Sequence, residues 1–303
     1  MKIEQYVPAD VPLEKEDAFA KNFESVTGGS GRLMLFAGDQ KVEHLNNDFY
    51  GKGIPTEDND PEHLFKIASA AKIGVFATQF GLIARYARRY HNIPYLVKLN
   101  AKTNLIPYEA KDPYSQQWLD VEDVIEFQKT NGLNIAGVGY TVYLGSEHEH
   151  AMLREAASIV HKAHLHGMIA VLWIYPKGRF VSDEHDAHLI AGAAGVGAAL
   201  GADFVKVKVP YREGVFVPEL LQEVTQAAGT TGVLCEGGSK TDEESFLREL
   251  HAQIHIGGSR GNGTGRNIHQ RPLKEAIAMA NAIYAVTVEN ASVEDALKIA
   301  KGA

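Results

Sequence analysis

The sequence predicts an α/β protein: a closed (β/α)8 barrel of the TIM type with a short N-terminal extension. From residue 32 onward, short apolar runs alternate with longer stretches of helical periodicity, and eight such runs can be counted. Strand–helix alternation favours a parallel sheet, and eight repeats is the number that closes a barrel. An open, doubly wound sheet is the alternative interpretation.

The predicted elements follow one another without a Ser/Pro-rich linker, so residues 31–303 are expected to form one barrel domain and residues 1–30 an N-terminal arm. The expected strands are Arg32–Asp39, Ile73–Gly81, Tyr95–Ala101, Ile135–Gly145, Met168–Pro176, Ala202–Pro210, Gly232–Gly238 and Gln253–Gly258. The expected helices are Leu13–Phe23 in the arm and Pro61–Ala71, Val121–Lys129, Met152–His166, Asp186–Leu200, Pro218–Ala227, Glu243–His251 and Leu273–Val286 in the barrel.

Composition narrows the class of protein. The 303 residues are 45% hydrophobic, which is enough for a substantial core. A formal net charge of −8 argues against a nucleic-acid binder, because such proteins neutralise phosphates over a broad surface. The single cysteine, Cys235, excludes an internal disulfide, and no segment resembles a secretion signal or a membrane span. We therefore expect a soluble, cytoplasmic protein with a small-molecule partner.

The sixth run, ADFVKVKVP, places two lysines on one face of a strand. Because side chains alternate along a strand, its valines face the helices while Lys206 and Lys208 face the barrel mouth. Burial penalises an ammonium group, and a second positive charge nearby favours the neutral form of its neighbour. A neutral amine is the nucleophile that forms a Schiff base with a ketone or aldehyde. The alternative is that both lysines end in solvent or pair with acids.

Three further polar side chains lie where predicted strands end. Tyr175 closes the fifth run among apolar neighbours; its hydroxyl could transfer protons, or simply reach water. Asp39 closes the first run and could polarise a substrate hydroxyl, orient a lysine or cap the following turn. Lys98 shares one face of the third run with Leu96 and Asn100, so it competes for the role of reactive amine.

Two glycine-bearing segments follow the last two runs. VLCEGGSK contains Gly237, Gly238 and Ser239, and GGSRGNGTGRNIHQR contains Gly265 and Arg266 before a helix. In barrels these loops often bind phosphate through backbone N–H groups, and glycine lets the anion come close. Arg266 would add a charge-assisted contact. The pair of segments indicates a phosphate site, although ordinary turns use the same residues.

No motif predicts a metal ion or a cofactor. His148 and His150 in SEHEH are spaced by two, which cannot place both on one helix face, and no HExxH pattern occurs. The run GAAGVGAALGA falls late in a helix, whereas a dinucleotide fingerprint opens one; we interpret it as a site of close packing.

These segments together resemble the archaeal-type class I fructose-1,6-bisphosphate aldolases, a barrel family related to deoxyribose-phosphate aldolase and other Schiff-base aldolases. The resemblance covers roughly residues 30–286 and rests, in order, on GVGYTVYLGS (137–146), WIYPKG (173–178), LGADFVKVK (200–208), EGGSK (236–240) and GRNIHQR (265–271). It implies that Lys206 is the Schiff-base lysine, that Tyr175 is the catalytic tyrosine and that Asp39 is the acidic residue ending the first strand. Phosphate contacts would come from Gly237, Gly238, Gly265 and Arg266.

The implied activity is a metal-independent, reversible cleavage of fructose 1,6-bisphosphate, a step of glycolysis and gluconeogenesis. Lys206 would attack the ketone, Tyr175 would give and take protons, and Asp39 would position hydroxyls or assist carbinolamine breakdown, with Lys208 as the second charge. The resemblance also suggests a homo-oligomer, up to a decamer. The alternatives are a related aldolase or transaldolase acting on another phosphosugar or an aminosugar precursor, and a catalytically silent sugar-phosphate-binding barrel.

The chain departs from that family in its first and seventh loops. Gln40 and Lys41 stand where the family commonly has His-Gly, and Glu236 stands where it usually has Ser. A carboxylate beside a phosphate is repulsive unless it points away or pairs with a cation such as Lys240. The stretch between Gly258 and Gly265 is also longer than the family pattern.

Overall fold

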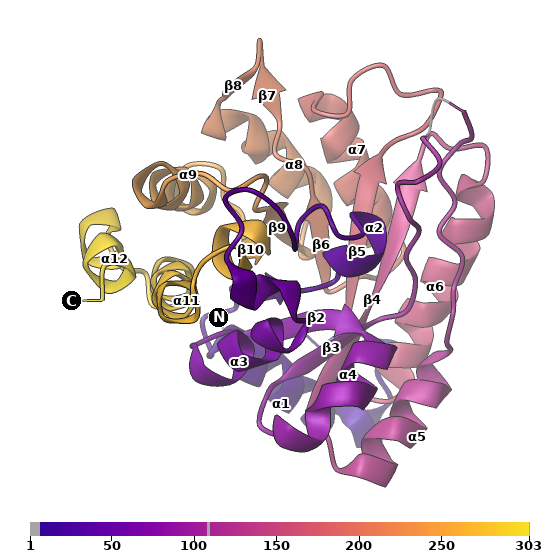
Figure 1. Ribbon diagram of the computed structural model, residues 1–303. Helices are drawn as coiled ribbons and strands as arrows, with labels where there is room; N and C mark the ends of the chain where they lie inside the picture. The colour runs from indigo at the N-terminus through magenta and orange to yellow at the C-terminus, as the bar shows by residue number, and fades with distance from the viewer. Residues whose placement is uncertain (1–6, 108–109, 303) are drawn as a thin grey trace.

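Eight parallel strands close into a barrel, so the predicted fold class is confirmed (Figure 1). The computed structural model describes residues 7–107 and 110–302, and the strands lie in the order β1-β10-β9-β6-β5-β4-β3-β2. Their bounds are β1 Leu33–Ala37, β2 Val75–Gln79, β3 Tyr95–Lys98, β4 Ile135–Leu144, β5 Ile169–Pro176, β6 Phe204–Val207, β9 Gly232–Glu236 and β10 Gly261–Thr264. A small antiparallel hairpin, β7 Tyr211–Arg212 and β8 Val215–Phe216, follows β6.

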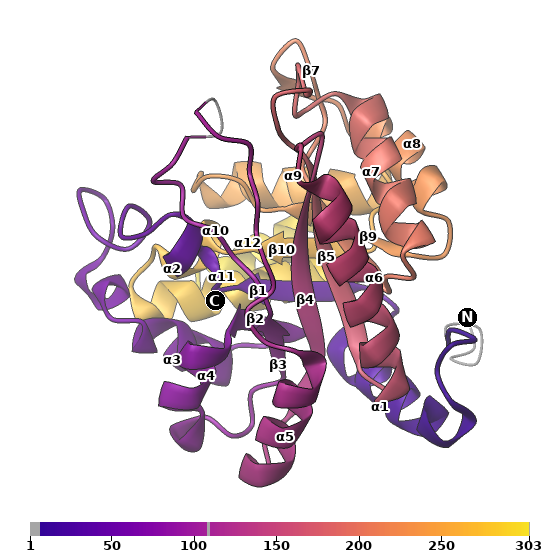
Figure 2. The same ribbon diagram turned by 90° about the vertical axis from the view of Figure 1, so that its right-hand side faces the viewer.

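Helices follow the strands and cover the outside of the barrel (Figure 2). The longer ones are α1 Glu16–Thr27, α3 Glu62–Ala70, α4 Phe80–Tyr86, α5 Val121–Asn131, α6 Glu149–Leu165, α7 Ala187–Ala199, α8 Leu221–Ala228, α9 Glu243–His255, α11 Leu273–Thr287 and α12 Val293–Ala300. Two single-turn helices, α2 Gln40–Glu43 and α10 Arg266–His269, follow β1 and β10. No helix in the described part of the chain is both long and apolar enough to cross a membrane.

Glycine allows α7 to lie close to the barrel. A Cβ atom at Gly197 would lie 2.3 Å from the Cγ1 atom of Val205 on β6, well inside contact distance. The glycine-rich run therefore serves close packing, as expected from its position late in a helix.

The eighth predicted strand, Gln253–Gly258, is wrong. Residues 253–255 are the last turn of α9, and the strand is β10, Gly261–Thr264. The apolar residues that suggested a strand continue a helical stripe, because Leu247, Leu250 and Ile254 are all buried on one side of α9. The true strand, GNGT, has no large apolar residue and so gives no strand signal.

Strand β10 is rich in glycine because its neighbours occupy the space where side chains would lie. A Cβ atom at Gly261 would lie 1.9 Å from the carbonyl oxygen of Leu33 on β1. A Cβ atom at Gly263 would lie 2.5 Å from Cε of Lys206. Part of the segment interpreted as a phosphate loop is therefore a barrel strand whose glycines make room for the neighbouring β1 and for the Lys206 side chain.

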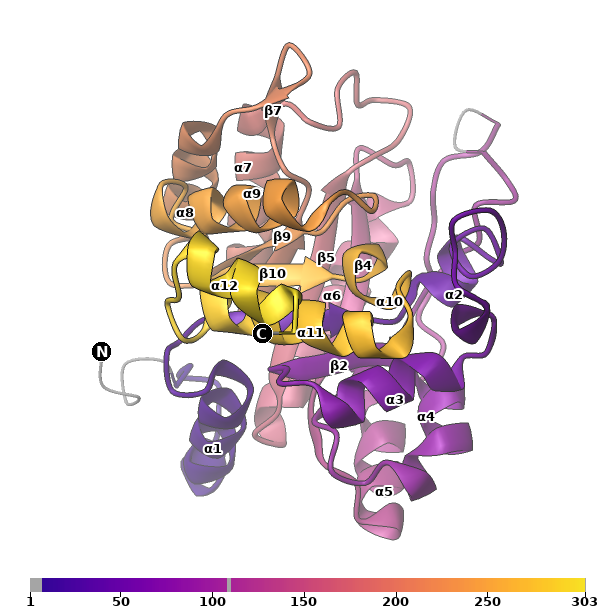
Figure 3. The same ribbon diagram turned by 60° about the vertical axis from the view of Figure 1, so that its left-hand side comes forward.

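Two of the longer helices were not predicted. α4 begins at Phe80, inside the run Ile73–Gly81, so the second strand ends earlier than expected, at Gln79. α12 lies beside α9 and α11 on the outside of the barrel, near the C-terminus (Figure 3).

The N-terminal segment is joined to the end of the barrel where the strands begin. Asn22 of α1 donates a hydrogen bond to the carbonyl oxygen of Gly167, in the turn before β5, at 2.8 Å. His164 of α6 is buried, with Nδ1 2.8 Å from Asp10 and Nε2 3.3 Å from Asp203, which precedes β6. Burial alone would lower the pKa of His164, but the hydrogen bonds and charges of Asp203 and Asp10 outweigh it and raise the pKa to about 8.

This cluster predicts a pH-dependent stability. The pKa of His164 rises from 6.5 to about 8 on folding, so its contribution is complete below the lower value and is lost as pH increases through the upper one. The free energy of unfolding should fall by about 2 kcal/mol across that interval, at about 1.4 kcal/mol per unit of pKa difference. Denaturation at pH about 6 and about 9 measures this fall, which His164→Gln should abolish. An equal fall in the wild type and the variant would contradict it.

Candidate active site

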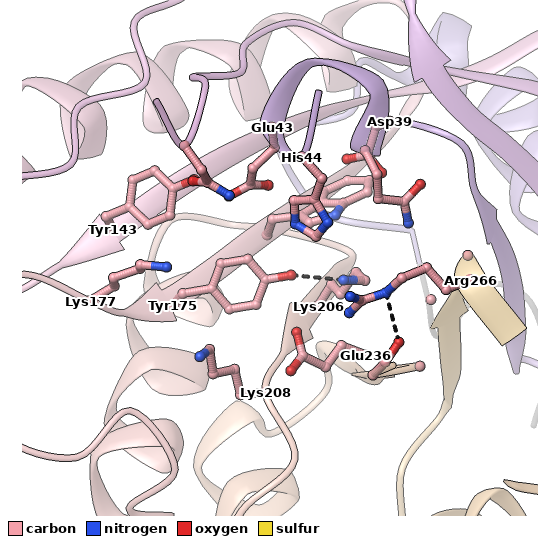
Figure 4. A pocket seen from close by; sticks show the side chains of 17 residues that line it. Asp39, Glu43, His44, Tyr143, Tyr175, Lys177, Lys206, Lys208, Glu236 and Arg266 are labelled. Carbon is pink, nitrogen blue, oxygen red and sulfur yellow. Dashed lines mark hydrogen bonds between the residues drawn. The ribbon is translucent and has the colours of Figure 1, made fainter. Parts of the chain in front are cut away.

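A pocket opens at the carboxyl ends of the strands, where barrel proteins carry their active sites (Figure 4). It is lined by Asp39, Gln40, Glu43, His44, Asn104, Tyr143, Trp173, Tyr175, Lys177, Lys206, Lys208, Glu236, Gly237, Gly238, Gly263, Gly265 and Arg266. The structure thus brings together every residue that the sequence suggested for the site except Ser239 and the competing amine, Lys98. Ser239 is exposed outside the pocket, and its carbonyl oxygen accepts a hydrogen bond from Asn267.

Lys206 projects from β6 into this pocket. In the strand register it lies between Trp173 of β5 and Leu234 of β9, and only 7% of the residue is exposed. Its Nζ donates a hydrogen bond to the hydroxyl oxygen of Tyr175 at 2.8 Å (Figure 4) and lies 6.0 Å from the centre of the Trp173 ring. The amine is therefore enclosed, reachable from the cavity and next to a hydroxyl group.

Tyr175 holds its proton firmly. Burial is the main reason that its pKa is raised well above the usual 10, and the negative charges of Glu236, Glu43 and Asp39 raise it further. At neutral pH the phenol is consequently protonated and can act as a proton donor. The alternative role, a tyrosine whose hydroxyl only reaches water, does not fit its contact with Lys206.

Asp39 lines the pocket just beyond β1. Burial raises the pKa of its carboxyl group, although the positive charges of Lys98 and Lys206 act in the opposite direction. The side chain makes no capping hydrogen bond to α2, so it is not simply a helix cap. A carboxyl group with a raised pKa beside an amine is suited to proton transfer.

Lys98, the competing amine, lies behind the pocket wall. It is 3% exposed, and its Nζ donates hydrogen bonds to Thr141 Oγ1 at 2.5 Å and to Asn100 O and Oδ1 at 3.2 and 3.3 Å. The same nitrogen lies 4.7 Å from the centre of the Trp173 ring. Burial lowers its pKa to about 8, and the charge of Lys206 contributes in the same direction. Lys98 does not line the pocket, whereas Lys206 does.

Lys208 pairs with an acid, the alternative raised for the two lysines of the sixth run. It lies just beyond the end of β6, and its Nζ donates to the carboxylate of Glu184. The positive charge of Lys208 is therefore compensated locally. The cation that interacts electrostatically with both Lys206 and Asp39 is Lys98.

The two glycine-bearing segments form one wall of the pocket. Nε of Arg266 donates to the carbonyl oxygen of Gly238 at 3.1 Å and so ties the loop after β9 to the segment after β10. Gly238 has φ of +62°, a conformation that other residues rarely adopt. At Gly265 a Cβ atom would lie 2.8 Å from the carbonyl oxygen of Ala37, so the close approach of β1 requires glycine.

Glu236 lines the cavity, and Lys240, the cation suggested as its partner from the sequence, bonds elsewhere. Nζ of Lys240 donates to the carbonyl oxygen of Gln270 at 2.6 Å, so Lys240 does not pair with Glu236. The carboxylate of Glu236 lines the pocket and raises the pKa of Tyr175. The Glu236 side chain therefore points into the pocket, where its charge favours the protonated form of Tyr175.

Several lining residues were not singled out from the sequence. Tyr143 of β4 donates its hydroxyl proton to Glu43 Oε1 at 3.0 Å. Its position was available from the alternation of β4, which places Gly139, Thr141 and Tyr143 on one face. Glu43 lies four residues after Asp39, one helical turn further along α2. His44 and Lys177 had no sequence signal.

No metal site is evident in the described residues. No group of three or more His, Cys, Asp or Glu side chains there is arranged to hold an ion. His148 precedes α6 and lies 3.5 Å from Glu147, while His150 is on the helix.

Comparison with known proteins places these residues in a family. Residues 33–271 match the DeoC/LacD family of aldolases. The chain is 54% identical over 98% of its length, and 94% of the relative's, to a fructose-bisphosphate aldolase/6-deoxy-5-ketofructose 1-phosphate synthase of Methanocaldococcus jannaschii.

Solved structures agree with this placement. The structure of a fructose-bisphosphate aldolase from Slackia heliotrinireducens superposes with a TM-score of 0.96 at 52% identity, covering 100% of this chain and 96% of that one. An archaeal fructose-1,6-bisphosphate aldolase has a TM-score of 0.74 at 29% identity, covering 89% and 99%. In that structure the catalytic lysine is covalently bound to the carbinolamine intermediate of the substrate.

The contact between Gly263 and Lys206 gives a test of the site. In Gly263→Ala the new Cβ would lie 2.5 Å from Cε of Lys206, so the lysine side chain must shift from its position beside Tyr175. Pyridoxal 5′-phosphate, which forms imines with nucleophilic lysines, should label Lys206 at least about tenfold more slowly, since small displacements of a reacting group are costly.

Gly192→Ala on the exposed side of α7, where a Cβ atom meets nothing within 4 Å, is the matched control. Labelling of Lys206 at the wild-type rate in Gly263→Ala would show that Gly263 does not position the amine.

Proposed function

Because the chain belongs to the DeoC/LacD family of aldolases, we propose that its pocket cleaves fructose 1,6-bisphosphate through a Schiff base on Lys206. The products are dihydroxyacetone phosphate and glyceraldehyde 3-phosphate, and the reaction is reversible. The chain is thus a carbon–carbon lyase of the fructose-bisphosphate aldolase type, as its relatives are. The observation that carries the assignment of Lys206 is the 2.8 Å contact between its amine and the Tyr175 hydroxyl inside the pocket.

The reaction begins with attack by the neutral amine of Lys206 on C2 of the ketose. The carbinolamine that results loses water to give a protonated imine, which withdraws electrons from the neighbouring bond. A base removes the proton of the C4 hydroxyl, the C3–C4 bond breaks, and its electron pair moves into an enamine. Glyceraldehyde 3-phosphate leaves, C3 takes up a proton, and water hydrolyses the imine to release dihydroxyacetone phosphate. The imine accepts the electrons, so the step needs neither metal nor cofactor.

Tyr175 and Asp39 divide the proton transfers. The high pKa of Tyr175 makes it the donor to C3 during cleavage and, by reversibility, the acceptor from C3 during synthesis. Asp39, whose pKa is raised by burial, retains a proton at higher pH than an ordinary aspartate. It is placed to orient substrate hydroxyls and to protonate the hydroxyl that leaves the carbinolamine.

Lys208 and Lys98 have different proposed roles beside Lys206. Lys208 is paired with Glu184, and we propose that it binds substrate at the pocket edge. Lys98 is close enough to interact with Lys206 and with Asp39, and we propose that it supplies the neighbouring positive charge that was expected from Lys208.

The loops after β9 and β10 are proposed to hold one substrate phosphate. Gly237, Gly238 and Gly265 offer backbone close to the cavity, and Arg266 adds a charged donor. Ser239 is left out of this set because it lies outside the pocket. Holding the phosphate fixes C2 of the substrate relative to Lys206, and such positioning lowers the barrier substantially.

The second name of the Methanocaldococcus relative suggests a second activity. That relative is 54% identical, against 31% for a fructose-bisphosphate aldolase of Halobacterium salinarum. A 6-deoxy-5-ketofructose 1-phosphate carries a single phosphate, and the glycine wall with Arg266 offers a site for one. We propose that the chain also synthesises this compound, which an assay of its formation would test.

We retain three further expectations as proposals. Residues 1–30 form an N-terminal arm and residues 31–303 a single barrel domain, the protein works in the cytoplasm, and it assembles as a homo-oligomer, up to a decamer. Exposed apolar side chains such as Phe180, Leu105 and Val215 are candidates for covered surface in such an assembly. Light scattering after size-exclusion chromatography tests the oligomeric state.

The Schiff base predicts covalent trapping. Borohydride reduction in the presence of dihydroxyacetone phosphate should attach the ligand to Lys206, as peptide mass spectrometry would show, because reduction converts the imine into a stable amine. Lys206→Met should give no adduct. Lys208→Met should still give one, although Lys208 lies only two residues further along the chain, on the same side of the strand. An adduct on Lys98, or none in the wild type, would contradict the proposal.

The proposed role of Tyr175 predicts that its loss slows C–C bond cleavage without preventing formation of the Schiff base. Tyr175→Phe should still form the adduct with dihydroxyacetone phosphate, because the amine remains. Cleavage of fructose 1,6-bisphosphate should slow by at least about 100-fold, the usual effect of losing a proton-transfer group. Tyr140→Phe is the matched control, since Tyr140 is a buried tyrosine bonded to Glu155 outside the pocket. Wild-type cleavage by Tyr175→Phe would remove Tyr175 from the mechanism.

A further inference from the structure

We propose that His44 is a ligand of the substrate phosphate, held by Asp48 beside Arg266. The inference rests on the proposed function and adds to it a residue from the first loop, outside the glycine segments. It concerns a phosphate monoester as the recognised group.

His44 enters the pocket from the end of α2. It is the residue that follows Gln40–Glu43, and its ring lines the cavity that also holds the Arg266 guanidinium (Figure 4). Its Nδ1 lies 2.5 Å from Asp48 Oδ2. Among the described residues Nε2 has no hydrogen-bond partner, so one ring nitrogen is fixed from behind and the other is left for a ligand.

Asp48 is itself held in place by the segment that follows β10. Its carbonyl oxygen accepts a hydrogen bond from Gln270 Nε2 at 2.8 Å. The next residue, Phe49, stacks on the ring of His269 with centroids 5.0 Å apart. The carboxylate that orients His44 is therefore tied to the chain segment that also carries Arg266.

Asp48 also links His44 to Arg266 directly. Nε of Arg266 lies 3.8 Å from Asp48 Oδ2, the oxygen that contacts His44. Arg266 Nε also donates to Gly238, and the two terminal nitrogens of the guanidinium make no hydrogen bond with a described residue. The same carboxylate oxygen thus bonds to His44 and lies within ion-pair distance of Arg266, which brings both side chains to one anion site.

The backbone between these residues supports the arrangement. Leu45 has φ of +58°, a conformation that is unfavourable for a branched side chain. The chain reverses here, which brings Asp48 back to His44, four residues earlier. Strained residues of this kind are found where surrounding structure holds a functional turn.

The carboxylate behind His44 is charged. Burial alone would raise the pKa of Asp48, but the hydrogen bond from His44 and the charges of His44 and Arg266 outweigh it and lower that pKa. The ionised carboxylate accepts the Nδ1 proton of His44, and a phosphate at the other ring nitrogen would accept a proton from Nε2 when both nitrogens carry one. The pocket also holds the carboxylates of Glu43 and Glu236, so a bound phosphate needs a cationic donor such as the Arg266 guanidinium next to it.

Titration with inorganic phosphate tests the proposal without requiring turnover. In His44→Ala the dissociation constant of phosphate, measured by calorimetry, should rise by about tenfold, the loss expected for one charge-assisted hydrogen bond. His44→Gln, which keeps a polar side chain but removes the imidazole ring, should show a similar rise. KM for fructose 1,6-bisphosphate should increase in parallel, with kcat reduced less than about threefold.

His188→Ala is the matched control, because His188 also lies 2.5 Å from a carboxylate, that of Glu223, but away from the pocket. Unchanged phosphate affinity in both His44 variants would overturn the proposal. A fall in kcat with unchanged phosphate affinity would overturn it too, and would assign His44 to proton transfer. Absence of a borohydride adduct in the wild type would refute the Schiff base but leave the phosphate titration interpretable.

Discussion

The hydrogen bond between the Lys206 amine and the Tyr175 hydroxyl is the contact on which the site depends. It joins β5 and β6 at the end of the barrel where the pocket opens, and both groups are almost fully buried. The strand register places Trp173 beside Lys206, and Gly263 on β10, two strands away, leaves room for the lysine side chain. The barrel strands therefore hold the proposed nucleophile and the proposed proton donor at hydrogen-bond distance.

Charged groups of both signs surround this contact. The negative charges of Asp39, Glu43 and Glu236 help to keep the phenol protonated, while the buried Lys98 lies close to the Trp173 ring. Arg266 lines the same pocket and lies within ion-pair distance of Asp48 in the first loop. The pocket therefore offers a cation for an anionic group of the substrate as well as an amine for its carbonyl carbon.

Much of the fold followed from alternating apolar and helical periods, and seven of the eight strands were predicted where they occur. The eighth strand was not predicted because GNGT contains no large apolar residue. Its glycines are required by the close approach of Leu33 and Lys206, which are distant in sequence. For the site, residues ending strands could be found from alternation. The pairing of Lys208 with Glu184 and the entry of His44 could not, because both depend on how loops fold over the barrel.

A crystal structure of the wild-type protein after exposure to dihydroxyacetone phosphate tests the central claim most directly. Continuous electron density between Lys206 Nζ and C2 of the ligand, with Tyr175 in contact and the phosphate against Arg266, is the predicted result. A ligand bound without a covalent link, or one linked to Lys98, would contradict the account.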